Sequence, residues 1–92
     1  MIVSFEHEGL MNCFLSGSLK GILAIHAKIL RLQLAVIGSA SKIEALDIPG
    51  YRLHELKGDR KGVWSITVNA SWRLTFKFSE GNAEPLNYED YH

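Results

Sequence analysis

Residues 62–78, which read GVWSITVNASWRLTFKF, are the part of the sequence that decides the fold. Apolar and polar residues alternate through both halves of this stretch, and aromatic and β-branched residues are frequent, as in half-buried strands. Only Asn69 and Ala70 separate the two alternating runs, which is the spacing of a tight hairpin. The stretch therefore predicts two antiparallel strands that share one apolar and one polar face.

Two further segments predict strands. Residues 2–5, IVSF, form a short β-branched run, and residues 83–91, AEPLNYEDY, follow a turn expected at residues 80–82. Pro85 is compatible with a strand at an edge of the sheet or near the strand's start, because proline cannot donate to the ladder. Three strands joined by short turns predict a largely antiparallel sheet.

The first half of the chain predicts two or three helices on one face of that sheet. A short helix is expected over residues 10–15, and Ser18 is a suitable N-cap for a long helix that ends near Gly38. The segment 41–46 adds one more turn or two. The order of strand, helices and three strands predicts an α+β fold that forms a single domain over residues 1–92.

The long helix is apolar over more of its circumference than a surface helix requires. Either a second element of the chain or a partner protein is expected to cover the extra apolar side. The apolar face predicted for this helix consists of Ile22, Ile25, Ile29, Leu32 and Val36.

Composition restricts the class of protein. The 92 residues are 47% hydrophobic and 22% charged, as in an ordinary small globular domain. The N-terminus lacks the basic segment of a signal peptide, and the charges within residues 19–37 argue against a membrane span. The single cysteine, Cys13, cannot pair within the chain, so a reducing compartment and a cytoplasmic location are expected.

The charges sum to zero but are unevenly distributed. Residues 51–78 carry six positive and two negative charges, whereas residues 79–92 carry four negative charges and no lysine or arginine. Affinity for phosphate depends on the local field, so the basic segment could contact nucleic acid. A solvated face with scattered lysines is the alternative.

The predicted hairpin would present part of this basic segment on one face. Arg73, Thr75 and Lys77 alternate with apolar residues, and the loop over residues 53–62 flanks the same face if the last strand pairs beside the hairpin. Such a face suits single-stranded RNA, with Tyr91 available to stack on a base. The expected RNA-binding residues are Arg60, Lys61 and Lys77.

RNA carries its own nucleophile, because a 2′-hydroxyl can attack the adjacent phosphate. The protein must then supply a base, an acid and cations for the negative charge that develops. His54 and His92 can fill the acid and base roles in either order, with Lys57 and Arg73 as charge stabilisers. Asp90 can orient a neighbouring imidazole or basic side chain. The alternative without catalysis is that the loop over residues 53–62 is only a polar loop with a charged rim and that Asp90 is only an acidic residue at the end of a hairpin.

No metal or cofactor is expected. The sequence contains no metal-ligand spacing, no glycine-rich phosphate loop and no GxSxG nucleophile motif. His7 and His26 are expected to be solvated or satisfied by hydrogen bonds rather than catalytic.

Residues 53–92 closely resemble the second half of HigB toxins, of the RelE-type superfamily of bacterial toxin–antitoxin modules. The shared pattern is L-x-x-L-x-G-x-R-x-G-x-x-S-I-x-V-N-x-x-W-R-(I/L)-x-F, followed by an acidic, aromatic and histidine terminus. The resemblance implies a small RelE-like microbial ribonuclease fold. The resemblance also implies that the functional positions of the family correspond to His54, Lys57, Arg73, Asp90, Tyr91 and His92.

The resemblance also implies an activity and partners. The expected protein enters the A site of the ribosomal 30S subunit and cleaves messenger RNA without a metal, which leaves a cyclic phosphate. A HigA-type antitoxin would neutralise it, and the complex would contact operator DNA through the antitoxin. No membrane partner is expected.

Two other functions remain open. The chain could be a catalytically silent partner and co-repressor of the antitoxin, although the presence of all six polar positions favours an active enzyme. It could also be a ribonuclease that acts on free RNA. The small number of cations favours a substrate that the ribosome presents.

Overall fold

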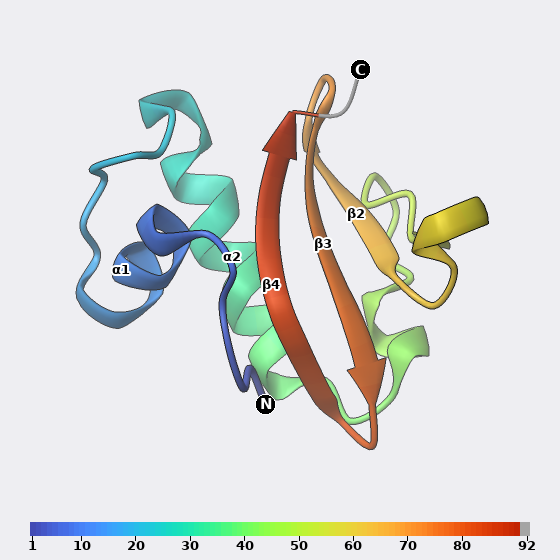
Figure 1. The fold of residues 1–92 in the computed structure, drawn as a ribbon. Helices are drawn as coiled ribbons and strands as arrows, with labels where there is room; N and C mark the ends of the chain where they lie inside the picture. Colours follow the sequence, from blue (N-terminus) through green and yellow to red (C-terminus); the bar gives the residue numbers. More distant parts are fainter. Residues whose placement is uncertain (91–92) are drawn as a thin grey trace.

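The computed structural model describes residues 1–90, and it has the predicted α+β architecture, with α1 and α2 beside the sheet (Figure 1). Tyr91 and His92 lie outside the described residues. The elements in chain order are α1 (Glu8–Ser16), the 3₁₀ helix η1 (Ala24–His26), α2 (Ala27–Ser39), the 3₁₀ helix η2 (Ile43–Leu46), β1 (His54–Glu55), the 3₁₀ helix η3 (Gly58–Arg60), β2 (Trp64–Asn69), β3 (Trp72–Ser79) and β4 (Asn82–Asp90).

The four strands form one antiparallel sheet in the order β1-β2-β3-β4. The hairpin predicted from residues 62–78 is confirmed, although its turn lies at Ala70 and Ser71, one residue later than expected. Glu80 and Gly81 make the second turn with φ angles of 53° and 78°, the left-handed conformation that tight hairpins use.

The predicted alternation of faces is also confirmed. Ile66, Leu74 and Tyr88 lie opposite one another on three strands, and all three are buried. They pack in a core that includes Leu30 and Leu34 of α2. One sheet face is thus covered by helices, and the other carries the polar side chains.

The first segment differs from the strand predicted over residues 2–5. Ile2 and Phe5 make isolated parallel bridges to Ala83 and Leu86 of β4. The amide of Val3 donates to Ala83 O at 2.9 Å. Pairing at only two separated positions attaches the segment to the outer edge of β4 without extending the sheet by a regular strand.

The long helix predicted from Ser18 was wrong at its start, because α2 begins at Ala27. The hydroxyl of Ser18 accepts a hydrogen bond from the amide of Lys20 at 3.3 Å, in a local turn rather than a helix cap. Gly21 follows with a φ of 85°, which a right-handed helix cannot contain. A Cβ on Gly9 would lie 3.0 Å from Lys20 O, so this segment packs closely against α1.

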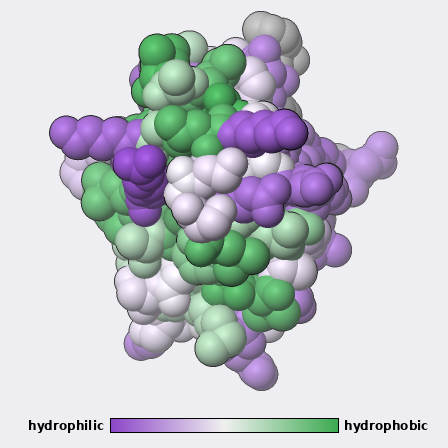
Figure 2. Space-filling model, turned by 90° about the vertical axis from the view of Figure 1, so that its left-hand side faces the viewer, coloured by the Kyte–Doolittle hydropathy of each residue, from purple (hydrophilic) through white to green (hydrophobic). Residues whose placement is uncertain are grey.

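The apolar face predicted for the long helix is only partly confirmed, because Ile22, Ile29 and Val36 are partly buried against the core. The residues of α2 that are buried are Leu30, Gln33, Leu34 and Ile37. Ile25, which precedes α2, and Leu32 are 77% and 60% exposed. Figure 2, which views the helix side, shows hydrophobic surface in several areas between hydrophilic side chains. Within residues 1–90, no helix is long and apolar enough to cross a membrane.

Candidate active site on the polar sheet face

The polar face of the sheet is built from all four strands. Residues directly opposite each other in antiparallel strands point to the same face, so the strand register defines rows of side chains. One row runs from His54 through Ser65 and Thr75 to Asn87. The adjacent row contains Thr67, Arg73 and Glu89.

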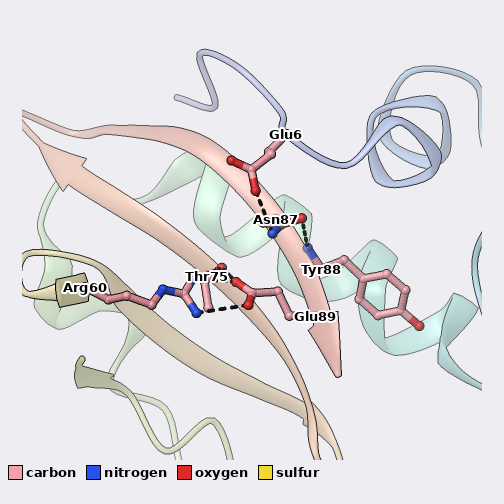
Figure 3. Close-up of polar contacts among 6 residues, drawn as sticks. All are labelled: Glu6, Arg60, Thr75, Asn87, Tyr88 and Glu89. Carbon is pink, nitrogen blue, oxygen red and sulfur yellow. Dashed lines mark hydrogen bonds and ion pairs between the residues drawn. The ribbon is translucent and has the colours of Figure 1, made fainter. Parts of the chain in front are cut away.

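Arg60 reaches from η3 across this face to β4 (Figure 3). Its Nη1 and Nη2 atoms donate to Glu89 Oε1 and Oε2 at 3.0 and 2.6 Å, and Nη2 also contacts the Thr75 hydroxyl at 3.4 Å. The Thr75 hydroxyl donates to the same carboxylate. The Arg60 hydrogen bonds hold the pKa of Glu89 below its ordinary value, so Glu89 is a carboxylate at neutral pH.

This contact makes the face less open than the sequence predicted. Ser65 and Thr75, in the middle of the face, are 0% and 2% exposed. The side chains of Arg60 and Glu89 remain 40% and 22% exposed. An RNA strand on this face would therefore contact the side chains of Arg60 and Glu89 rather than Ser65 and Thr75 beneath them.

A hollow of about 470 Å³ lies on the same face and is lined by Arg60, Lys77, Glu6, Asn87 and Glu89, among others. The Asn87 amide donates to Glu6 Oε2 at 2.9 Å. Two carboxylates thus offset two cations at this position, and the local charge is less positive than the sequence count suggested. Sequence reasoning missed both carboxylates. The alternation of β4 could have indicated Glu89, but only the folded chain brings Glu6 here.

His54 lies on β1 at the edge of the polar face and is exposed. Its Nδ1 is 2.9 Å from the carbonyl oxygen of Arg52. A carbonyl can only accept a hydrogen bond, so this contact favours the tautomer with the proton on Nδ1. The Nε2 lone pair of the neutral ring is then available to accept a proton.

Arg73 lies on the same face as His54, at the centre of the sheet. Its Nη1 donates to the Thr67 hydroxyl at 3.0 Å, which orients the guanidinium. Two strand spacings and one row separate the two residues, which corresponds to roughly 12 Å between Cα atoms. The fold thus brings together an imidazole and a guanidinium that are 19 positions apart in the chain.

The remaining predicted cations surround this pair. Lys57 and Lys61 are exposed on either side of η3 and line a small hollow with Glu55. Glu55 Oε2 accepts from the amide of Gly62 at 3.0 Å, which closes the loop that carries both lysines. Lys77 is exposed farther along β3.

Asp90 is directed differently from the other candidates. It lies opposite Trp72 in the register, and Trp72 packs against the core on the helix-covered face. The Ser71 hydroxyl donates to Asp90 Oδ1, which joins the end of β4 to the β2–β3 turn. Asp90 therefore stands at the end of the sheet and not in the row of Arg73. The candidates Tyr91 and His92 fall outside the described residues.

The two histidines predicted to be structural have hydrogen-bond partners. His7 caps α1, with Nδ1 accepting from the amide of Leu10 at 3.0 Å. His26 is 1% exposed, and its Nδ1 lies 2.6 Å from the hydroxyl of Tyr88. Burial lowers the pKa of His26 and raises that of Tyr88.

The described part of the chain is an antiparallel sheet with helices on one face and polar side chains, cations among them, on the other. Comparison with known families identifies its class. The model of the HigB-like toxin family, described as RelE-like toxin of type II toxin–antitoxin system HigB, matches residues 3–92. The chain belongs to this family.

A characterised relative covers the whole chain. The protein named Endoribonuclease HigB, from Proteus vulgaris, is 49% identical to it over 92 residues, which are the full length of both chains. The resemblance inferred from residues 53–92 is thereby confirmed and extends through the helical half.

Proposed function

We propose that this chain is an endoribonuclease that cleaves messenger RNA in the A site of the ribosome and so inhibits translation. The observation that carries the proposal is the shared sheet face of His54 and Arg73, with Lys57, Lys61 and Lys77 near its edges. The name of the Proteus vulgaris relative supports the same reaction.

The reaction requires no group beyond the RNA and the side chains. The 2′-oxygen attacks the adjacent phosphorus and loses its proton to a base, while the 5′-oxygen leaves with a proton from an acid. The product is a cyclic phosphate. His54 and His92 supply base and acid, in an order that the pH dependence of variants would establish. Because His54 is exposed and its Nδ1 is held by the carbonyl oxygen of Arg52, its Nε2 is the ring nitrogen that would approach a bound ribose.

Cations and neighbouring groups complete the proposed site. Arg73, held by Thr67, and Lys57 stabilise the charge that develops on the phosphorane. Asp90 orients a neighbouring basic group from the end of the sheet, and Tyr91 stacks on a base. The RNA-binding residues are Arg60, Lys61 and Lys77.

The charge of the polar face favours a ribosome-bound substrate. Glu6 and Glu89 stand beside Lys77 and Arg60 in the hollow of this face, which reduces attraction for phosphate. Weak affinity for free RNA is acceptable if the ribosome holds the messenger in place, because positioning then comes from the larger assembly.

The family supports an antitoxin as partner, since its members are the toxins of type II systems. We propose that this antitoxin is of the HigA type, that it neutralises the chain in the cytoplasm, and that the pair contacts operator DNA through the antitoxin. No cofactor takes part in the proposed reaction.

The test is inducible expression in a bacterium of the intact chain and of His54→Ala and His92→Ala. We expect growth arrest and messenger RNA cut on ribosomes for the intact chain, and a loss of cleavage of about 100-fold or more in each variant. Lys42→Ala, which removes an exposed cation after α2, is the matched control and should arrest growth.

Three results would redirect the proposal. Undiminished cleavage in both histidine variants would remove the catalytic role of the imidazoles. Cleavage of purified RNA at the same rate with and without ribosomes would indicate a free ribonuclease. An intact chain that binds the antitoxin and cleaves nothing would be a silent co-repressor.

A further inference from the structure

The helix side of the molecule has a surface that the proposed reaction does not use. Among residues 1–90, the large hydrophobic side chains that remain well exposed all lie between Met1 and Leu32. Figure 2 shows hydrophobic areas on this side. Contiguous exposed apolar patches on a protein commonly mark sites of interaction with other molecules.

One part of this surface forms a groove of about 500 Å³. Its walls are Ile25 of η1, Ile29 and Leu32 of α2, and Val68 and Asn69 at the end of β2. Lys28 also lines it, and we call it the α2 groove. Ile25 and Leu32 are the most exposed of its apolar residues, at 77% and 60%. Ile25 belongs to η1 and Leu32 to α2, and together with Ile29 they form an apolar stripe that crosses the junction of the two helices.

Among the described residues that line the α2 groove, Lys28 brings a positive charge and none brings a carboxylate. No carboxylate occurs between residues 9 and 43, whereas Lys20, Lys28, Arg31 and Lys42 do. An occupant of this surface must bring apolar side chains for the stripe. It is also favoured if carboxylates flank those side chains, since charge complementarity steers association and fixes orientation.

We propose that the α2 groove docks an amphipathic segment of the antitoxin, with apolar side chains on one face and carboxylates along its rim. This inference rests on the proposed function for the existence of that partner. Many protein complexes form in this way: an amphipathic helix lays its apolar face in a hydrophobic groove, and apolar residues at helical spacing anchor it there.

The charge pattern disfavours a second copy of the chain as occupant. In a two-fold symmetric dimer the same patch meets itself, so a dimer through this groove would bring the Lys28 side chains of the two copies together. Nucleic acid would match the lysines but leave Ile25 and Leu32 without apolar contacts.

The groove lies on the opposite side of the sheet from His54 and Arg73. The buried residues of α2 pack in the core against the inner faces of β2 and β3, and His54 and Arg73 are on the outer face. Substitutions on the exposed side of α2 therefore do not contact the site on the sheet, and binding and cleavage can be tested separately.

The test measures binding of the purified antitoxin to the intact chain and to three exposed-residue variants by calorimetry. Leu32→Glu places a carboxylate in the stripe and should weaken binding about 100-fold. Lys28→Glu should weaken it about 10-fold and reduce its dependence on salt. Leu15→Glu, a change on α1 at a residue that is 68% exposed, is the matched control and should leave binding within about 3-fold.

The outcomes separate this inference from the proposed function. Loss of binding in Leu32→Glu with messenger RNA cleavage retained supports the groove. Binding that is equal in Leu32→Glu and the intact chain overturns it, whatever the cleavage result. A chain that is dimeric alone and becomes monomeric in Leu32→Glu would also overturn it, because a second copy would then be the occupant. Failure of the intact chain to cleave affects only the proposed function.

Discussion

Arg60 and Glu89 are joined by two hydrogen bonds of 3.0 and 2.6 Å across the polar face of the sheet, although 29 positions separate them in the chain. The pair fixes the η3 loop against β4. It also places a carboxylate beside one of the cations proposed to bind RNA. Stability and substrate affinity therefore compete at this contact, because Arg60 cannot be fully available to both Glu89 and a phosphate.

The first prediction concerns Glu89→Gln, which removes the charge of this carboxylate and keeps its size. Because Arg60 lowers the pKa of Glu89 in the folded state, the pair stabilises the fold above the ordinary glutamate pKa of 4.5, and this contribution is lost as the pH falls through the lowered value. We expect Glu89→Gln to cost about 1 kcal/mol at neutral pH and less in acid. Urea unfolding of both proteins over a pH series measures the difference.

Thr75→Val is the comparison for this experiment, since it removes one hydroxyl contact and leaves the ion pair. The loss in free energy of unfolding caused by Thr75→Val should decrease less at acidic pH than the loss caused by Glu89→Gln. A loss in free energy of unfolding for Glu89→Gln that grows as the pH falls would contradict the lowered pKa of Glu89 in the folded state.

The second prediction concerns His26, which is buried against the Tyr88 hydroxyl. Burial lowers the pKa of His26 below its ordinary value of 6.5 in the folded state, so the unfolded chain binds the proton first as the pH falls. The stability contributed by the neutral imidazole is present above the ordinary pKa of 6.5 and should decline as the pH falls below it toward the lowered pKa of the folded state. His26→Gln should flatten this dependence, as measured by the midpoint of thermal unfolding.

Tyr88→Phe serves as the control for His26, because it removes the hydroxyl partner and leaves the imidazole in place. This variant should be less stable by about 1 kcal/mol but should keep the decline with falling pH. An identical pH dependence in His26→Gln and the intact chain would show that another group is responsible.

The third prediction concerns Arg73 and the residue that orients it. Arg73→Ala should lower the rate of cleavage by 100- to 1,000-fold, with a smaller effect on binding, because the guanidinium acts on charge that develops in the transition state. Thr67→Val should lower the same rate by roughly 10-fold by releasing Nη1. Single-turnover cleavage of messenger RNA on programmed ribosomes measures both.

Thr67→Ser retains the hydroxyl and should restore most of the rate lost in Thr67→Val. Circular dichroism of each variant would check that the fold is intact. A folded Arg73→Ala protein that cleaves at the unaltered rate would exclude Arg73 from the transition state.

The sequence was most informative where local pattern and tertiary structure agree. Residues 62–78 predicted the hairpin and both of its faces, because alternation with period two fixes which side chains a strand buries. The boundary of α1 was also predictable, since Gly17 adopts a φ of 76° at its end. Arg73 and Lys77 could be placed on one face from alternation alone.

Prediction failed where distant segments decide the local conformation. Ser18 has the properties of an N-cap, yet close packing of residues 20 and 21 against Gly9 in α1 makes the chain turn there instead. The helical pattern of residues 22–36 contains two apolar stripes. Which of them becomes buried depends on the angle at which α2 meets the sheet, so Ile25 and Leu32 could not be assigned to the exterior from sequence.

The sequence by itself thus determined the class of fold, the family and the polar face of the central hairpin, because these follow from periodicities and motifs within short stretches. The tertiary structure alone decided which residues share the candidate site. It brought Glu6 to Asn87 across 81 positions and Glu89 to Arg60, and it directed Asp90 away from the row of Arg73. The physical reason is that strand register and loop closure set these neighbours, and neither quantity is encoded by any local segment.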